Sequence, residues 1–205
     1  MTITGSHSVP FVRLRRGVLA MVLATFLAGC GVNNIPTYEE QAKAAWSQVQ
    51  NQYQRRADLI PNLVETVKGA ATFERETLQA VIEARGKVAQ TTIPPDVLTN
   101  PEAFRAFEQN QAALTSALSR LLVVVERYPD LKANQNFLSL QSQLEGTENR
   151  IAVARRDYIE AVRRYNTELR TFPGRLWAMT LYSGSEPMQN FTVAEDVSKA
   201  PTVKF

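Results

Sequence analysis

The sequence contains one cysteine, Cys30, and one histidine, His7, among its 205 residues. A single cysteine cannot form a disulfide within the chain, and these two residues cannot supply the ligands of a Cys/His zinc site. His7 lies in an N-terminal segment that we expect to be removed. The mature domain then lacks the imidazole of a catalytic triad and the Glu-x-x-His pairs of a di-iron bundle. We therefore expect no metal ion and no cofactor.

After Cys30 the sequence also lacks long apolar runs and an excess of either charge. Its longest aliphatic run, Leu121 to Val125, is far shorter than the roughly 20 residues of a membrane-spanning helix. Three of the 23 Lys and Arg residues precede Cys30, which leaves 20 basic residues against 20 acidic ones. Because affinity for nucleic acids depends on neutralised phosphates, this balance argues against DNA or RNA as a partner.

The N-terminus has the pattern of a bacterial secretion signal. Three arginines precede an apolar stretch from Val18 to Phe26, which leads into Leu27-Ala28-Gly29-Cys30. These four residues resemble the lipobox of bacterial lipoprotein precursors, and the resemblance implies that residues 1–29 are cleaved and that Cys30 is acylated. The alternative is an uncleaved signal anchor, but the apolar stretch is short for a spanning helix.

Several acyl chains on Cys30 would hold the protein stably at a membrane. The residues after Cys30 would then lie outside the cytoplasm, in the periplasm or at the cell exterior. Gly31 follows the cysteine where an aspartate would favour the inner membrane, so we expect the outer membrane. Residues 30–36 are short, polar and interrupted by proline, which is typical of a tether.

Apolar residues then recur at helical spacing through most of the chain. The clearest heptad lies between Asp130 and Phe172 and consists of two series offset by three residues. The first series is Phe137, Leu144, Ile151, Tyr158, Tyr165 and Phe172, and the second is Leu140, Thr147, Ala154, Ala161 and Glu168. A second heptad runs from Phe104 to Tyr128, after a helix start at Asn100-Pro101. Only Pro129 separates the two, with Asp130 as a cap, so we expect antiparallel neighbours.

The region from Thr37 to Gln90 carries two further apolar stripes with Pro61 between them. Pro61 either kinks one long helix or lies in a turn between two antiparallel helices. We favour the turn, with Asp58 capping the second helix and Pro61 in its first turn, where its missing N–H is harmless. Two consecutive prolines, Pro94 and Pro95, end this region.

These patterns predict an all-α fold, an antiparallel up-and-down bundle of about four long helices, or three if Pro61 only kinks a helix. The bundle occupies residues 37–172. Residues 173–205 form a C-terminal tail with one or two helical turns from Arg175 to Leu181, and otherwise irregular structure. We expect this tail to pack on the bundle through Trp177, Leu181 and Phe191.

Long ungapped runs of the sequence resemble the LemA family. The runs are RRADLIPNLVETVKG at 55–69 and YPDLKANQNFLSLQSQLEGTENRIAVARRDYIEAVRRYNTELRTFP at 128–173, together with Ala45-Trp46-Ser47 and Ala200-Pro201-Thr202-Val203. The resemblance implies an antiparallel helical bundle fixed to a bacterial membrane by its N-terminal segment. It implies no reaction, because the family has no established catalytic residues. Many members have a spanning helix where this chain has a lipobox, and residues 183–198 also diverge.

No residue stands out as catalytic. Asp58, Asn62 and Glu65 share one helical face beside Pro61 and are our candidates for binding, although capping and salt bridging also explain them. A metal held by carboxylates, or an acid pair acting on a sugar bond, would have to use Asp58, Glu65, Glu145 and Glu148. Arg155-Arg156 and Arg163-Arg164 are spaced for a lipid-headgroup patch. Glu160 can pair with Arg164, so ordinary surface charge explains them better.

Three functional hypotheses follow. The first is a non-enzymatic, lipid-anchored scaffold or partner-binding bundle that binds an unidentified protein of the cell envelope. The second is an envelope hydrolase, which requires two carboxylates converging in a cleft. The third is a homo-oligomer that assembles through an exposed stripe of one of the two heptad helices.

Overall fold

The protein is described here by a computed structural model, over residues 31–69, 74–90 and 94–191. The predicted signal, Cys30 and the C-terminal residues from 192 onward lie outside these ranges. The described residues form six helices and no strand, which confirms the predicted all-α bundle. The helices are α2 (Asn34–Lys68), α3 (Arg75–Gln90), α4 (Pro101–Val125), α5 (Pro129–Lys132), α6 (Gln135–Arg170) and α7 (Gly174–Thr180).

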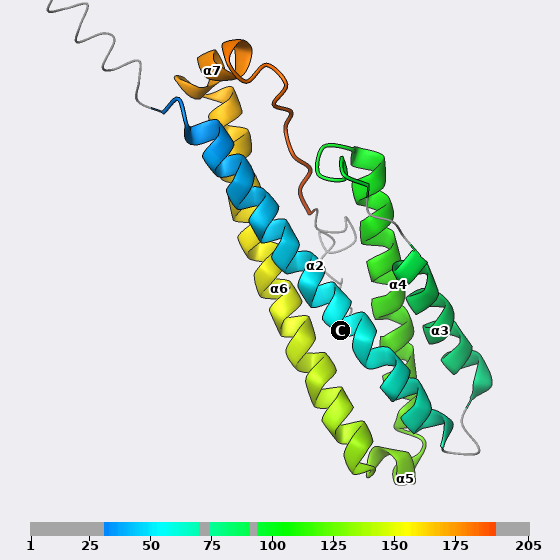
Figure 1. Cartoon of the computed structure of the whole chain (residues 1–205). Helices are drawn as coiled ribbons and strands as arrows, with labels where there is room; N and C mark the ends of the chain where they lie inside the picture. Colours follow the sequence, from blue (N-terminus) through cyan, green and yellow to red (C-terminus); the bar gives the residue numbers. More distant parts are fainter. Residues whose placement is uncertain (1–30, 70–73, 91–93, 192–205) are drawn as a thin grey trace, which may run out of the picture.

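The long helices are arranged as two antiparallel pairs (Figure 1). The first pair is α2 with α6, which are 35 and 36 residues long and lie against each other along most of their length. The second pair is α3 with α4. We expected α4 and α6 to be antiparallel neighbours that partner each other, but each packs mainly on a different helix. The apolar stripe of α6 is longer than α4, and burying a stripe along its length requires an equally long partner.

Pro61 lies inside α2, which is continuous from Asn34 to Lys68. The predicted turn at Pro61 and the cap at Asp58 were therefore wrong. Pro61 does lie within one helix, as in the alternative, but that helix ends at Lys68 and α3 begins at Arg75, so the expected continuation to Gln90 was wrong as well. Proline has no N–H to donate to the carbonyl four residues earlier, that of Ala57. The Nε of Arg85 on α3 donates to that oxygen at 3.1 Å. A side chain from the neighbouring helix thus replaces the hydrogen bond that the proline removes.

This replacement makes a testable prediction. Replacing Arg85 with methionine is expected to lower the free energy of unfolding by about 1 kcal/mol, the typical net contribution of one hydrogen bond. In a Pro61→Ala background the restored amide donates to the Ala57 carbonyl, so the same substitution should cost almost nothing. Urea unfolding of the four chains measures this coupling as a double-mutant cycle. Equal costs in both backgrounds would show that Arg85 acts through other contacts.

The helix starts agree only partly with the predictions. The side chain of Asn100 accepts hydrogen bonds from the amides of Glu102 and Ala103, which confirms it as the cap of α4. The long heptad helix starts at Gln135 and not at Asp130, which lies in the short α5. Its cap is Asn134, whose side chain accepts from two amides of the first turn. Similarly, α2 begins three residues before Thr37, because Pro36 is tolerated in a first turn.

The segment after α6 folds back along the bundle (Figure 1). The predicted helical turns are confirmed as α7, and Trp177 and Phe191 pack on the core as expected, but Leu181 is exposed. Hydrogen bonds from α6 side chains to the backbone hold the returning segment in place. Asn166 donates to the carbonyl of Met188 and accepts from its amide, and the Tyr158 hydroxyl donates to the carbonyl of Gln189 at 2.7 Å.

The core consists of two apolar clusters, stacked along the bundle. One cluster surrounds Trp46, which lies within 6.2 Å, between ring centroids, of four other aromatic rings: Phe104, Phe107, Tyr158 and Phe191. The other is mainly aliphatic and includes Ile60, Leu114, Leu121, Phe137 and Leu144. Among the helices of the described ranges, none has the length and apolar character needed to cross a membrane.

Candidate functional site

A buried polar layer separates the two apolar clusters. Its centre is Arg56 on α2, whose side chain is only 1% exposed. Gln111 on α4 is also buried, and Glu148 on α6 reaches Arg56 from a half-exposed position. The layer therefore joins three helices at one level of the bundle.

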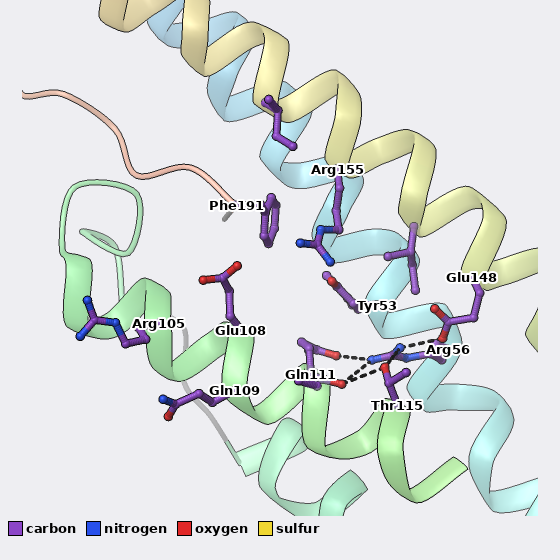
Figure 2. Close-up of a pocket in the computed structure, with 13 residues that line it drawn as sticks. Tyr53, Arg56, Arg105, Glu108, Gln109, Gln111, Thr115, Glu148, Arg155 and Phe191 are labelled. Carbon is purple, nitrogen blue, oxygen red and sulfur yellow. Dashed lines mark hydrogen bonds and ion pairs between the residues drawn. The ribbon is translucent and has the colours of Figure 1, made fainter. Parts of the chain in front are cut away.

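Every residue that accepts a hydrogen bond from the Arg56 guanidinium lies on another helix, either α4 or α6 (Figure 2). Nη1 donates to Thr115 Oγ1 at 2.8 Å and to Glu148 Oε1 at 2.7 Å. Nη2 donates to the side-chain oxygen of Gln111 at 2.7 Å and to its backbone oxygen at 3.3 Å. The ring of Tyr53 lies one turn away, with its centroid 5.0 Å from the Arg56 guanidinium carbon. Nε is buried without a hydrogen-bond partner.

A buried guanidinium is stable only where its charge is paired and its N–H groups are bonded. The carboxylate of Glu148 supplies the charge, and Gln111 and Thr115 accept further hydrogen bonds from Nη1 and Nη2, which leaves only Nε of the guanidinium nitrogens unbonded. Any sliding of α2 past α4 or α6 would break these bonds at once. The layer therefore sets the register of the α2–α6 pair against α4, as single polar residues do in coiled-coil seams.

The layer also forms the floor of a cleft of about 590 Å³. One wall is α4, with Arg105, Glu108 and Ala112, and the other is α6, with Ile151, Arg155 and Ile159. Phe191, from the returning C-terminal segment, closes one end (Figure 2). A cleft of this volume is within the range of known ligand and peptide side-chain sites.

Aromatic and cationic side chains meet at the mouth of the cleft. The guanidinium carbon of Arg155 lies 4.2 Å from the ring centroid of Phe191, a cation–π contact. Burial raises the pKa of the Tyr53 hydroxyl, and the nearby guanidinium groups of Arg155 and Arg56 partly oppose that rise. Tyr53 is therefore neutral at physiological pH.

The residues that we singled out from the sequence do not line this cleft. Asp58, Asn62 and Glu65 are exposed on the outer face of α2. Asp58 accepts a hydrogen bond from Gln54 at 2.7 Å and Glu65 pairs with Lys68 at 3.3 Å, both within the helix. Their role in binding stays a prediction, and they do not line the cleft beside Arg56.

Of the other acidic and basic candidates, some line the cleft and some lie on the exposed surface. Glu148 joins the cleft, whereas Glu145 accepts a hydrogen bond from Gln141 on the exposed side of α6. Glu160 pairs with Arg163 at 2.7 Å and with Arg164 at 3.0 Å, and these two guanidinium groups lower the pKa of Glu160 to about 2. This pairing confirms the expectation of ordinary surface charge there. The ranges that the structure describes contain no group of three or more acidic, His or Cys residues placed to hold a metal ion.

Sequence reasoning missed Arg56 and the cleft, although a signal was present. The buried face of α2 follows alternating spacings of four and three residues, and Arg56 occupies one of its positions. Gln111 and Thr147 similarly interrupt the stripes of α4 and α6. The polar residues in the seams of α2 and α4 indicate a shared layer, whereas Thr147 bonds within its own helix, to the Gln143 carbonyl at 2.7 Å. The partners could be matched only once the helix pairing was known.

A sequence model of the LemA family matches residues 45–205, which include every residue of the cleft. The chain belongs to the LemA family. Protein LemA of Metamycoplasma hominis is 24% identical over 140 residues, which cover 68% of this chain and 60% of that protein. Magnetosome protein MamQ 2 of Paramagnetospirillum magneticum is 26% identical over 157 residues, 69% of this chain and 58% of that protein.

Magnetosome protein MamQ of Magnetospirillum gryphiswaldense is 24% identical over 163 residues, which cover 72% of this LemA-family chain and 60% of that protein. The matched regions thus span about 60% of the length of these three relatives. The family assignment agrees with the resemblance found in the two long sequence runs around Pro61 and along α6.

Proposed function

We propose that this LemA-family protein is a non-enzymatic, lipid-anchored module of the bacterial cell envelope that binds an envelope protein in the cleft between α4 and α6. The observation that carries the proposal is the cleft itself. Its floor is fixed by the buried Arg56 layer, so its walls keep their spacing without a ligand. A preformed site loses less conformational entropy on binding than a flexible one.

The lining of the cleft indicates the chemistry of the partner. Arg155, Phe191 and Tyr53 are of the residue types that dominate binding energy at protein interfaces. Ile159 adds an exposed aliphatic surface on the same wall. We propose that the partner segment places an apolar side chain against Ile159 and Phe191 and a carboxylate beside Arg155.

The anchor in this proposal is Cys30, on the strength of the Leu27-Ala28-Gly29-Cys30 pattern. Replacing Cys30 with alanine is expected to yield a chain that keeps residues 1–29 and carries no acyl mass, because the peptidase and the acyl transferase both need the thiol. Mass spectrometry of the membrane fraction measures this, with globomycin treatment of the parent chain as a second block. Processing that is unchanged by either treatment would refute the lipid anchor. Fractionation of inner and outer membranes tests the expected outer-membrane location.

The partner site is tested by photo-crosslinking in intact cells. A photoreactive amino acid at position 159 is expected to capture a protein, because Ile159 is exposed inside the cleft wall. The matched control is position 153, where Val153 is an exposed aliphatic residue of the same helix that does not line the cleft. Equal products from both positions would contradict a specific site. A product with twice the mass of this chain would instead support self-assembly.

A carboxylate-dependent hydrolase remains the second candidate, because Glu108 and Glu148 line the same cleft. Glu148 is committed to the Arg56 ion pair, which limits its use as a proton donor. Release of soluble fragments from peptidoglycan by the purified chain, lost on Glu108→Gln, would favour this candidate. No release would remove it for that substrate.

A further inference from the structure

The end of the bundle that carries α7 exposes large apolar side chains. Phe172 is 86% exposed and Met179 is 69% exposed, and Leu176 and Leu181 are exposed as well. We call these four residues the α7 face. The opposite side of α7 is already used, because Trp177 and Ala178 pack on the aromatic core. Leu176 and Met179, three residues apart on α7, therefore project away from the bundle, with the exposed Phe172 and Leu181 just before and after the helix.

This face lies beside the point where the chain leaves towards Cys30. A Cβ atom built on Gly31 would lie 3.6 Å from Cγ of Pro173, the residue between Phe172 and α7. The side-chain amide of Asn34 also donates to Glu168 at 3.1 Å, which ties the start of α2 to the end of α6. Figure 1 shows the start of α2 and α7 at the same end of the molecule. Because Cys30 is bonded to Gly31, any lipid on Cys30 begins next to the α7 face.

Cationic side chains border the same end. Arg170 and Arg175 are exposed on either side of the Phe172-Pro173 corner. The nearby carboxylate of Glu168 already accepts the hydrogen bond from Asn34. Exposed apolar side chains flanked by arginines are the combination that binds at the surface of an anionic bilayer, where the apolar groups enter the headgroup boundary.

We infer that the α7 face lies in the headgroup boundary of the membrane that holds Cys30, with Arg170 and Arg175 contacting anionic phospholipids. This inference rests on the proposed lipid anchor. A small apolar surface is sufficient, because the anchor makes its contact with the bilayer intramolecular and so raises its effective concentration. The end of the bundle that carries α7 then contacts the membrane. Arg56 is about 33 Å along α2 from Asn34 at about 1.5 Å per residue, so the cleft is held away from the bilayer and faces other envelope proteins.

The test measures how deep position 179 lies in a bilayer. The full chain is purified from membranes and reconstituted in vesicles of phosphatidylethanolamine with a minority of phosphatidylglycerol, after nitroxide labelling of a Met179→Cys variant. The matched control is Val123→Cys, because Val123 is 70% exposed but lies near the end of α4 farthest from α7. The spectra compare collision of each nitroxide with oxygen, which concentrates in lipid, and with a water-soluble nickel complex.

The oxygen-to-nickel collision ratio is expected to be several-fold higher at position 179 than at position 123. Equal ratios at the two positions would overturn the inference. A low ratio at position 179 with spin–spin broadening would overturn it too, because the face would then bind a second copy. Labelling of the unsubstituted chain distinguishes failure of this inference from failure of the lipid anchor. Acylated Cys30 has no free thiol and takes no label. A labelled Cys30 would refute the anchor itself.

Discussion

Replacing Arg56 with alanine is expected to lower the free energy of unfolding by about 2–5 kcal/mol, the range measured when a large buried side chain is truncated to alanine. The substitution removes four hydrogen bonds and leaves the buried side chain of Gln111 without its donor. It also opens a cavity between the two apolar clusters, whose lining loses van der Waals contacts. Urea unfolding followed by far-ultraviolet circular dichroism measures the loss.

Arg55 provides a matched control for this experiment. It precedes Arg56 on α2 but is exposed, so Arg55→Ala should change stability by no more than about 0.5 kcal/mol. A second comparison converts the layer to apolar residues. The double variant Arg56→Met with Gln111→Leu should recover much of the lost stability, because no buried polar group is then left unpaired. If Arg56→Ala costs as little as Arg55→Ala, the layer does not contribute to the folded state as we describe.

Replacing Gly174 with alanine is expected to cost about 3 kcal/mol, at the upper end of the range for overpacking. A Cβ atom at this position would lie 2.2 Å from the backbone oxygen of Glu168 and 2.8 Å from Cγ of the same residue. A backbone carbonyl cannot rotate away as a flexible side chain can, so α7 must move off the end of α6. Thermal unfolding measures the cost, and near-ultraviolet circular dichroism reports the changed surroundings of Trp177.

At Gly86, replacement by alanine is expected to raise the free energy of unfolding instead of lowering it. It lies within α3, and a Cβ atom there would meet no atom within 4 Å. Gly86→Ala should therefore raise the free energy of unfolding by about 1 kcal/mol, since alanine has the higher helix propensity. If both glycine substitutions changed stability in the same direction, close packing of Gly174 on α6 would not be the cause.

Much of the architecture was predictable because its signals are local. The structure confirms the stripe of α4 and the α6 heptad as far as Tyr158. Beyond that the heptad was partly wrong, since Val162 and Leu169 are buried in place of Ala161 and Glu168, and Phe172 is exposed. Asn100 acts as a cap because its side chain needs only the two amides that follow it. Periodicity and caps depend on residues within one or two turns, so a sequence reports them directly.

The site was harder to predict, since its members are far apart in the sequence. Arg56 bonds to residues 55 to 92 positions later in the chain. Each one alone resembles ordinary surface chemistry, and Arg56 sits beside an arginine that is in fact exposed. Asp58, Asn62 and Glu65 attracted attention because they are close in sequence, but they face solvent.

The sequence by itself determined the helical class, the start of α4 at Asn100, the end of α6 at Arg170 and most of the faces that are buried, because these follow from spacing and from residue chemistry within single turns. Only the tertiary structure decided that α6 pairs with α2, that Pro61 stays within a helix and that Arg56, Gln111 and Glu148 meet in one polar layer. Each of these depends on what a distant segment supplies. Pro61 is accommodated within α2 because Arg85 of another helix donates a hydrogen bond to the Ala57 carbonyl. Arg56 can be buried because Glu148 and Gln111 accept hydrogen bonds from its guanidinium.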